Sequence, residues 1–248
     1  MIGVREMNTI TAKTTIGVLA SGGMDSCVLM GRLLEQDRVV QPFYVCCGLI
    51  WEAAELAALK RFLAAIARPR LKPPVVFEMP LADLYGTHWS IDGRGTPDAR
   101  SADEAVYLPG RNALLLVKPA LWCAMQGIEE LALATLAGNP FSDATDDFFC
   151  AYQAALRQAT GSQLTMLRPF ARSSKADVLR LGQHLPLELS FSCLRPQACR
   201  PCGECNKCAE RQHVFRLLGR KDPTLYATKR DNSAVSDVLP PSNFRFPP

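Results

Sequence analysis

A short stretch near the start of the chain limits its fold more than any other: TTIGVLASGGMDSCVLMG, residues 14–31. Residues 14–20 form a β-branched, apolar run typical of a buried strand, and apolar residues at helical spacing follow the turn. Glycines at positions 22 and 23 permit a close approach of backbone to ligand. Because a helix start presents free N–H groups and a positive dipole end, such a turn attracts an anion. We therefore predict a phosphate-binding turn made by Ser21, Gly22, Gly23, Asp25 and Ser26.

The rest of the chain continues the alternation of strand and helix. Further strands are expected at residues 39–47, 75–79, 131–137 and 164–167, with helices at 25–36, 56–66, 111–125, from 146 onward and 174–183. This alternation predicts an α/β fold, a parallel sheet with helices on both faces, whose ligands bind beyond the carboxyl ends of the strands. Residues 80–110, rich in glycine and proline, are expected to form a long loop over a site.

Composition sets the protein class. The 248 residues are 48% hydrophobic and 21% charged, which is typical of a globular protein. The net charge of +4 suits small anionic ligands and is too weak by itself to indicate a nucleic-acid binder. There is no signal-peptide pattern and no apolar run long enough to cross a membrane, so a cytoplasmic protein with no membrane partner is expected. We expect an α/β domain at residues 14–190, a cysteine-rich subdomain at 191–225 and an irregular tail at 226–248.

Ten cysteines require an explanation, because a cytoplasmic protein rarely forms disulfides. Five are scattered through apolar segments and are expected to be small buried hydrophobic residues: Cys27, Cys46, Cys47, Cys123 and Cys150. The other five lie between residues 193 and 208. The spacing of Cys202, Cys205 and Cys208 suits a structural zinc ion held by four thiolates, and an iron–sulfur cluster is the alternative. Spacing alone leaves Cys193 and Cys199 as rivals for the fourth position.

The turn S-G-G-x-D-S after a strand resembles the PP-loop of the ATP pyrophosphatases, which split ATP into AMP and pyrophosphate to adenylate a substrate. Over residues 14–225 the chain is similar to one family of these enzymes, the 7-cyano-7-deazaguanine synthases of queuosine precursor synthesis. The similarity extends to YLPGRNALLL (107–116), RPFARSSKADVLRLG (168–182), and SC (192–193) followed by CGECNKCAER (202–211).

The resemblance implies specific roles for residues. Gly110, Arg111 and Asn112 match a stretch near the nucleotide, and Lys175 matches a lysine that approaches phosphate oxygens, so Lys175 and Arg111 would offset charge on the departing pyrophosphate. The zinc ligands would be Cys193, Cys202, Cys205 and Cys208.

The resemblance also implies a reaction. A carboxylate, 7-carboxy-7-deazaguanine, would be adenylated with ATP and magnesium, converted by ammonia to an amide, and dehydrated to the nitrile with a second ATP. The family further implies a homodimer.

Two stretches depart from the family pattern. Leu49, Ile50 and Trp51 stand where the family has Gln-Arg-His, and Ala144 and Thr145 follow Asp143 where the family has Cys-Arg. Loss of polar groups near a polar substrate changes recognition. The alternative function is therefore that of a divergent paralogue, which would activate a deazaguanine-like carboxylate for transfer to another acceptor such as a macromolecule. Some relatives lie in antiviral gene clusters, which would imply a defence role.

Other residues allow two interpretations. A nucleic-acid-binding zinc knuckle would use the cations of the cysteine segment, Arg195, Arg200, Lys207 and Arg211, although aromatic residues for base stacking are few there. His88 is expected to be incidental, and His213 is expected to be structural. Asp25 and the acidic residues Asp143, Asp146 and Asp147 are candidates either for magnesium binding or for helix capping.

Overall fold

Five parallel strands form one sheet in the order β3-β2-β1-β4-β5. The structure is a computed structural model, and it describes residues 14–227. The order reverses next to β1, the strand that leads into the Ser-Gly-Gly turn, and such a reversal is where α/β proteins bind ligands. The strands are β1 (Thr15–Leu19), β2 (Val39–Cys46), β3 (Val75–Glu78), β4 (Glu130–Ala132) and β5 (Thr165–Leu167).

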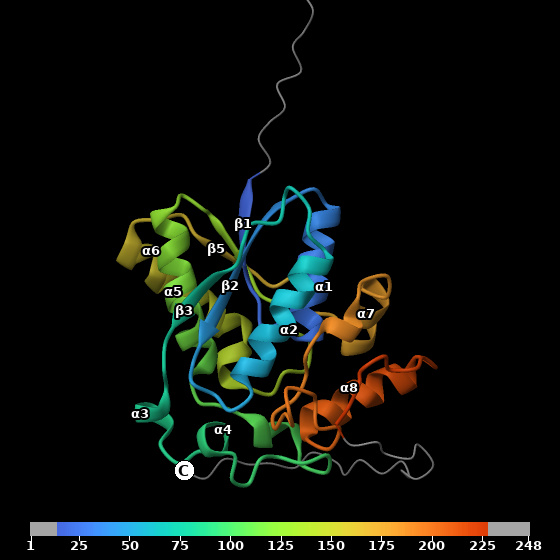
Figure 1. Cartoon of the computed structure of the whole chain (residues 1–248). Helices are drawn as coiled ribbons and strands as arrows, with labels where there is room; N and C mark the ends of the chain where they lie inside the picture. The colour runs from blue at the N-terminus through green and yellow to red at the C-terminus, as the bar shows by residue number, and fades with distance from the viewer. Residues whose placement is uncertain (1–13, 228–248) are drawn as a thin grey trace, which may run out of the picture.

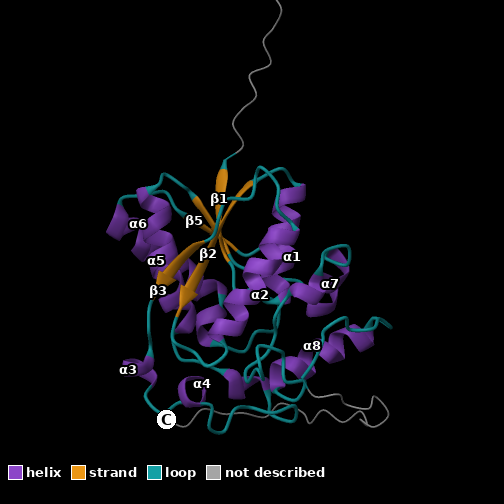
Figure 2. Ribbon diagram, in the orientation of Figure 1, coloured by secondary structure: helices purple, strands orange, loops and turns teal. Residues whose placement is uncertain are grey.

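Helices cover both faces of the sheet (Figures 1 and 2). On one side lie α1 (Met24–Glu35) and α2 (Glu52–Ala65), with α7 (Lys175–Leu181) packed on α1; on the other lie α5 (Arg111–Met125) and α6 (Asp146–Thr160). The short helices α3 (Ala82–Tyr85) and α4 (Trp89–Asp92) and the longer α8 (Asn206–Leu217) lie beyond the carboxyl ends of the strands, at the bottom of Figure 1. Three 3-10 turns complete the described elements: η1 (Asp103–Val106), η2 (Ser142–Ala144) and η3 (Leu187–Leu189).

The predicted parallel α/β fold is confirmed, with two local corrections. The strand expected at 131–137 is wrong in length, because β4 pairs only over 130–132 and residues 133–137 run past the sheet. The loop expected at 80–110 contains α3, α4 and η1. The predicted tail lies outside the described residues except for residues 226 and 227.

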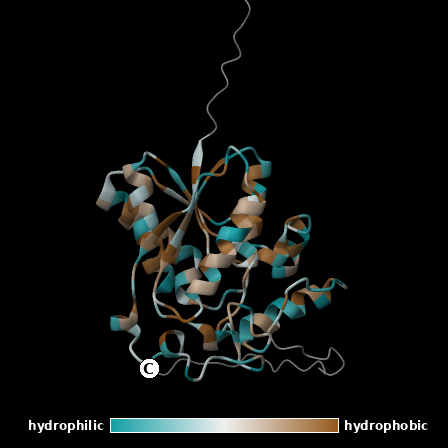
Figure 3. Cartoon of the chain, in the orientation of Figure 1, coloured by the Kyte–Doolittle hydropathy of each residue, from teal (hydrophilic) through white to brown (hydrophobic). Residues whose placement is uncertain are grey.

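Hydrophobic residues, brown in Figure 3, are frequent on the strands and on the helices, and many of them form one buried core cluster. Cys27, Cys46, Cys47 and Cys123 are buried, as predicted, whereas Cys150 is exposed on α6, so its predicted burial is wrong. A second buried cluster lies beyond the carboxyl ends of the strands and joins Leu49 and Trp51 to the C-terminal cysteines. None of the helices within residues 14–227 has both the length and the apolar character needed to cross a membrane.

The contact between α1 and α7 is very close at two glycines. A Cβ atom on Gly182 would lie 2.2 Å from Val28 Cγ2, and one on Gly31 would lie 2.5 Å from Leu185 Cδ1. Contacts this short do not occur between real side chains. A side chain at Gly31 would require Leu185 to change its rotamer, whereas one at Gly182 would meet the β-branched Val28 and push α7 away from α1. The close packing brings the first residue of α7, Lys175, to the start of α1.

Candidate active site and metal centre

A cavity of about 430 Å³ opens at the carboxyl ends of β1, β2 and β4. Residues from α2, α5, α7 and α8 complete its wall. Four residues predicted from the sequence line it together, Ser21, Arg111, Asn112 and Lys175, although they come from three distant segments. The cavity has the position that a parallel sheet gives to a ligand site and a volume suited to a small molecule.

The Ser-Gly-Gly turn is held rigidly at the edge of this cavity. Gly22 adopts a φ of +72°, and a Cβ atom there would lie 3.1 Å from both the Glu55 carbonyl oxygen and Leu59 Cβ. The Gly23 N–H donates to Ser21 Oγ at 3.2 Å, and Ser26 Oγ donates to the Gly23 carbonyl at 3.0 Å. Because α2 packs directly under the turn, its backbone needs glycine both for conformation and for space.

Helix α1 begins at Met24, and no side chain caps it. The capping role considered for Asp25 is therefore wrong. The first-turn N–H groups of a helix have no partners within the helix. An anion bound in the turn would supply acceptors for them.

Asp25 instead belongs to a row of four alternating charges. Lys175 Nζ lies 3.3 Å from Asp25 Oδ2 and 2.9 Å from Glu210 Oε1, and Lys207 Nζ lies 3.0 Å from Glu210 Oε2. Burial by itself lowers the pKa of Lys175, but the two carboxylates outweigh it and raise that pKa above its ordinary value. Although burial opposes it, the neighbouring ammonium groups lower the pKa of Glu210 to about 2. Lys175 and Glu210 are therefore both charged at neutral pH.

The start of α5 is fixed by Asp143. Its Oδ2 accepts a hydrogen bond from the Asn112 N–H at 2.9 Å, and Asn112 Nδ2 donates to the Asp143 carbonyl at 2.9 Å. Asp143 therefore has the helix-capping role expected as one of its two roles, although it caps α5 rather than its own helix. Of the other two acids, Asp146 pairs with Arg168 and Asp147 is exposed.

Arg111 follows the left-handed Gly110 and extends along the cavity wall. Its guanidinium lies over the Trp51 ring, 5.8 Å from the centroid. Within residues 14–227, the buried atoms Arg111 Nε and Asp25 Oδ1 have no hydrogen-bond partner. Buried polar atoms are nearly always paired. One donor and one acceptor thus stay available, which fits a ligand that brings both phosphate oxygens and a cation.

Two cavity residues, Glu55 and Tyr44, carried no sequence signal. The Tyr44 hydroxyl donates to Glu55 Oε2 at 2.8 Å. Burial raises the pKa of Glu55 to about 7, against the lowering effects of the Arg111 charge and the Tyr44 hydrogen bond.

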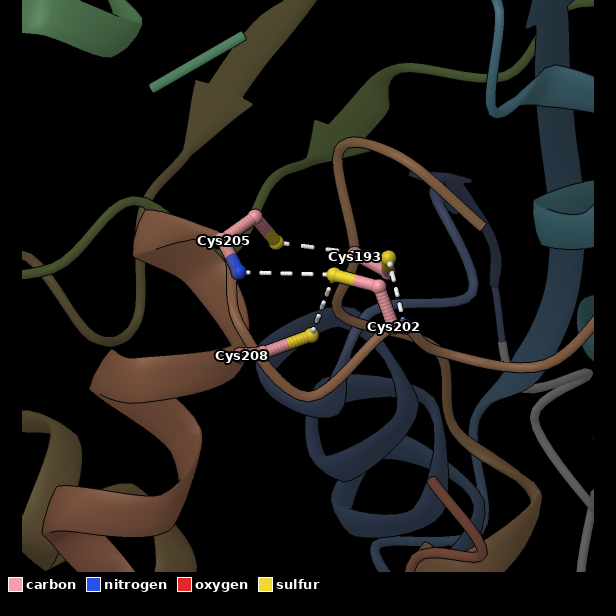
Figure 4. Close-up of side chains that lie close together, drawn as sticks. All are labelled: Cys193, Cys202, Cys205 and Cys208. Carbon is pink, nitrogen blue, oxygen red and sulfur yellow. Dashed lines mark hydrogen bonds between the residues drawn. The ribbon is translucent and has the colours of Figure 1, made fainter. Parts of the chain in front are cut away.

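Four cysteines converge into a group that could hold a metal ion (Figure 4). The sulfurs of Cys193, Cys202, Cys205 and Cys208 all lie within 4.8 Å of one another, and the four residues are buried. The Cys202–Cys208 and Cys193–Cys205 sulfur pairs are 3.9 and 4.0 Å apart. Bonds of about 2.3 Å to one tetrahedral zinc ion require sulfurs about 3.8 Å apart. Cys199 is exposed and outside the group, so the rivalry for the fourth position is decided in favour of Cys193.

Backbone N–H groups also donate to these sulfurs. Leu194 N–H donates to Cys205 Sγ at 3.3 Å and Cys202 N–H donates to Cys193 Sγ at 3.2 Å. Such bonds stabilise thiolates and orient them as metal ligands. The donor set fits a single ion with no open position, and it is too tight to surround a multi-iron cluster.

The remaining sequence candidates have local roles. His88 caps α4 by accepting from the Ser90 N–H, and His213 is exposed on α8. Arg211 is 1% exposed and pairs with Asp222, so its predicted contact with nucleic acid is wrong.

The two altered stretches have different positions relative to the cavity. Leu49 and Trp51 are buried, and Trp51 stacks on Trp89 with ring centroids 5.7 Å apart. Neither of them lines the cavity, whereas Phe141, beside the second altered stretch, does. The first altered stretch is therefore packed in the interior, whereas the second lies next to a residue of the cavity wall.

The chain is similar to proteins of a known family. The family model described as queuosine biosynthesis protein QueC matches residues 15–219. The 7-cyano-7-deazaguanine synthase of Brucella canis is 33% identical over 222 residues, covering 84% of this chain and 92% of the relative. The enzyme of the same name from Allorhizobium ampelinum is 30% identical, covering 84% and 91%.

Two solved structures are more distant. One, described as a predicted subunit of a tRNA methyltransferase from Methanocaldococcus jannaschii, has 13% identity and a TM-score of 0.45, covering 84% of this chain and 89% of that one. The other is a 4-thiouridine synthetase–RNA complex with bound ATP, at 12% identity and a TM-score of 0.48, covering 83% and 50%.

The family model spans most of the chain, and the relatives are matched over nearly their whole length. The ATP-dependent synthase class expected from the sequence motifs is confirmed by this match. The chain belongs to the QueC family of queuosine biosynthesis proteins.

Proposed function

We propose that this protein adenylates 7-carboxy-7-deazaguanine in the cavity at the carboxyl ends of β1, β2 and β4. The substrate carboxylate attacks the α-phosphorus of ATP, which forms an acyl-adenylate and releases pyrophosphate. Ammonia then displaces AMP to give the amide. A second ATP adenylates the amide oxygen and releases a second pyrophosphate, and loss of AMP together with two protons then yields the nitrile.

The observation that carries this proposal is the convergence of Ser21, Arg111 and Lys175 on one cavity. The Ser-Gly-Gly turn and the start of α1 hold the phosphates that leave as pyrophosphate. Lys175 and Arg111 are cations fixed before the reaction begins, so they stabilise charge that develops on the leaving group without reorganising. Their main contribution is placement of the two reactants and electrostatic stabilisation.

Magnesium and zinc fit the residues present. Asp25, with one buried and unpaired carboxylate oxygen, would hold a magnesium ion beside the phosphates. When bound, magnesium shields the charge of the phosphate oxygens. The four thiols would hold zinc in a closed structural site, where metal binding stabilises the fold of the C-terminal segment.

The test is a reaction with purified protein, ATP, magnesium, ammonium and 7-carboxy-7-deazaguanine, with AMP and organic products followed by mass spectrometry. We expect substrate-dependent AMP and the nitrile, and a Lys175→Met variant should lose at least 100-fold in AMP formation. Metal analysis should find one zinc per chain, and light scattering should find a homodimer. Absence of AMP with this substrate would contradict the proposal.

The second candidate is activation of a related carboxylate for transfer to an amine on another molecule. Phe141 in the cavity wall and Ala144–Thr145 beside it, where the family has Cys-Arg, favour it. In this case, AMP formation would require a different carboxylate or an acceptor in place of ammonia. An acceptor that is a protein or nucleic acid would be found by its gain in mass.

A further inference from the structure

Helix α8 joins the metal centre to the nucleotide cavity. Cys205 immediately precedes the helix and Cys208 lies in its first turn, so Lys207 is enclosed between two metal ligands. Asn206, which is 6% exposed, anchors the first turn of α8 through two hydrogen bonds. Its N–H donates to the Pro97 carbonyl at 3.1 Å, and its Nδ2 donates to the Ser101 carbonyl at 2.9 Å. The backbone of Lys207 is therefore fixed by covalent neighbours and by hydrogen bonds.

The side chain of Lys207 points to the same cavity as Lys175 and Ser21, and all three residues line it. Lys207 is 32% exposed at its side chain, compared with 19% for Lys175. The cavity wall formed by α7 and α8 thus carries two ammonium groups, joined through the carboxylate of Glu210.

These two cations are not equally neutralised. Lys175 has two carboxylate partners, Asp25 and Glu210, whereas Lys207 pairs with Glu210 alone within the described part of the chain. Lys207 is at the end of the charge row, shares its one partner and is more exposed. It therefore has more attraction left for an anion than Lys175 has. A flexible lysine acts on phosphate as a point charge and needs no exact angle.

We infer that Lys207 is a second polyphosphate-binding cation of the nucleotide site. The four-cysteine centre holds the first turn of α8 in place and thereby positions Lys207 at the cavity. The ligand class is a pyrophosphate or the triphosphate of a nucleotide. Glu210 is a positioning residue that holds both lysines on one wall. This inference rests on the proposed function, since it assumes that phosphates occupy the cavity, and it gives the metal centre a part in forming the nucleotide site.

The test measures binding rather than turnover, using the metal-loaded full-length chain. Lys207→Met and Lys207→Arg are compared with Lys60→Met, a change at an exposed lysine of α2 outside the cavity lining. Calorimetry gives the Kd for magnesium pyrophosphate, MgATP and adenosine, and metal analysis and thermal unfolding are run on each variant. Lys207→Met should raise the Kd for pyrophosphate and MgATP about ten-fold, the size of one lost charge-assisted hydrogen bond. Adenosine binding, metal content and the midpoint of unfolding should not change.

Lys207→Arg should restore the Kd to within about three-fold, because charge rather than shape is required. An unchanged pyrophosphate Kd in Lys207→Met would overturn the inference. So would an equal loss of adenosine affinity, or a loss of metal without rescue by arginine, since each indicates a merely structural role. Wild-type protein that binds MgATP but releases no AMP with any carboxylate would refute the proposed function and leave this comparison intact.

Discussion

The Tyr44 hydroxyl donates a hydrogen bond to Glu55 Oε2 at 2.8 Å, and both residues line the cavity at the carboxyl ends of the strands. The carboxyl group of Glu55 gives up hydration in this position, which is why its pKa rises from an ordinary 4.5 to about 7. The Tyr44 hydrogen bond and the Arg111 charge offset only part of that penalty. The pair thus places a carboxyl group that titrates near neutral pH beside the proposed phosphate site.

Glu55→Gln should change the pH dependence of stability. Between pH 4.5 and 7 the folded protein holds a proton on Glu55 that the unfolded chain has released, so wild-type stability falls as pH rises through this window and levels off above it. The amide cannot ionise and still accepts from Tyr44. The variant should therefore gain about 3 kcal/mol relative to wild type between pH 4 and pH 8. Urea unfolding across this range measures it.

Glu129→Gln, at an exposed position, is the control and should leave the pH dependence of unfolding unaltered. Parallel stability curves for wild type and Glu55→Gln would contradict the raised pKa.

Gly22→Ala should weaken phosphate binding by the Ser-Gly-Gly turn. The new Cβ would meet the Glu55 carbonyl and Leu59 Cβ, and the residue would keep a left-handed backbone. Gly161→Ala is a matched comparison, because Gly161 has φ +66° with no atom within 4 Å of its Cβ position. The backbone penalty of about 1 kcal/mol should appear in both variants. Only Gly22→Ala should also lose at least ten-fold in pyrophosphate affinity, measured by calorimetry.

Cys193→Ser should release the metal, because three thiolates leave the tetrahedral site incomplete. Since metal binding stabilises the fold of the ligand segment, the midpoint of thermal unfolding should fall by about 10 °C or more. Cys199→Ser is the control, because this thiol is exposed and outside the cluster. Metal analysis of both variants decides the assignment, and loss of metal in Cys199→Ser would reverse it.

Asp143→Ala should loosen the start of α5. It removes the acceptor for the Asn112 N–H, which costs about 1–2 kcal/mol of stability. Since Arg111 is the neighbouring residue, the KM for ATP should rise as well. Asp147→Ala removes an exposed carboxylate nearby and should leave the KM unchanged. An Asp143→Ala variant with wild-type stability would show that this cap contributes nothing.

Local sequence patterns predicted much of this fold. The strand leading into Gly22, the helix begun by Ser174 and the spacing of Cys202, Cys205 and Cys208 are each encoded within a few residues, where backbone preference and side-chain chemistry act directly. The helix expected from residue 174 is present and begins with a capping box between Ser174 and Asp177, and the cysteines expected to bind a metal lie together.

The residues that sequence analysis missed depend on distant packing. Glu55 reaches the cavity because α2 packs under the turn at Gly22, and Glu210 reaches it because α8 turns back toward α7. Lys207 was considered only as part of a nucleic-acid surface, since nothing in the sequence around it indicates that Lys175, 32 residues earlier, lies beside it. The length of β4 was not predicted because it depends on how many residues of β5 are available for pairing.

At Gly182, directly after α7, a hydrogen atom stands where a methyl group would lie 2.2 Å from Val28 Cγ2 of α1. The first residue of α7, Lys175, lies 3.3 Å from Asp25 in the first turn of α1. A methyl group at Gly182 would push the end of α7 away from α1 and draw the two charges apart. A residue without a functional group thus helps to set the charge geometry of the proposed nucleotide site, and natural variation there would change phosphate affinity while every polar residue stayed the same.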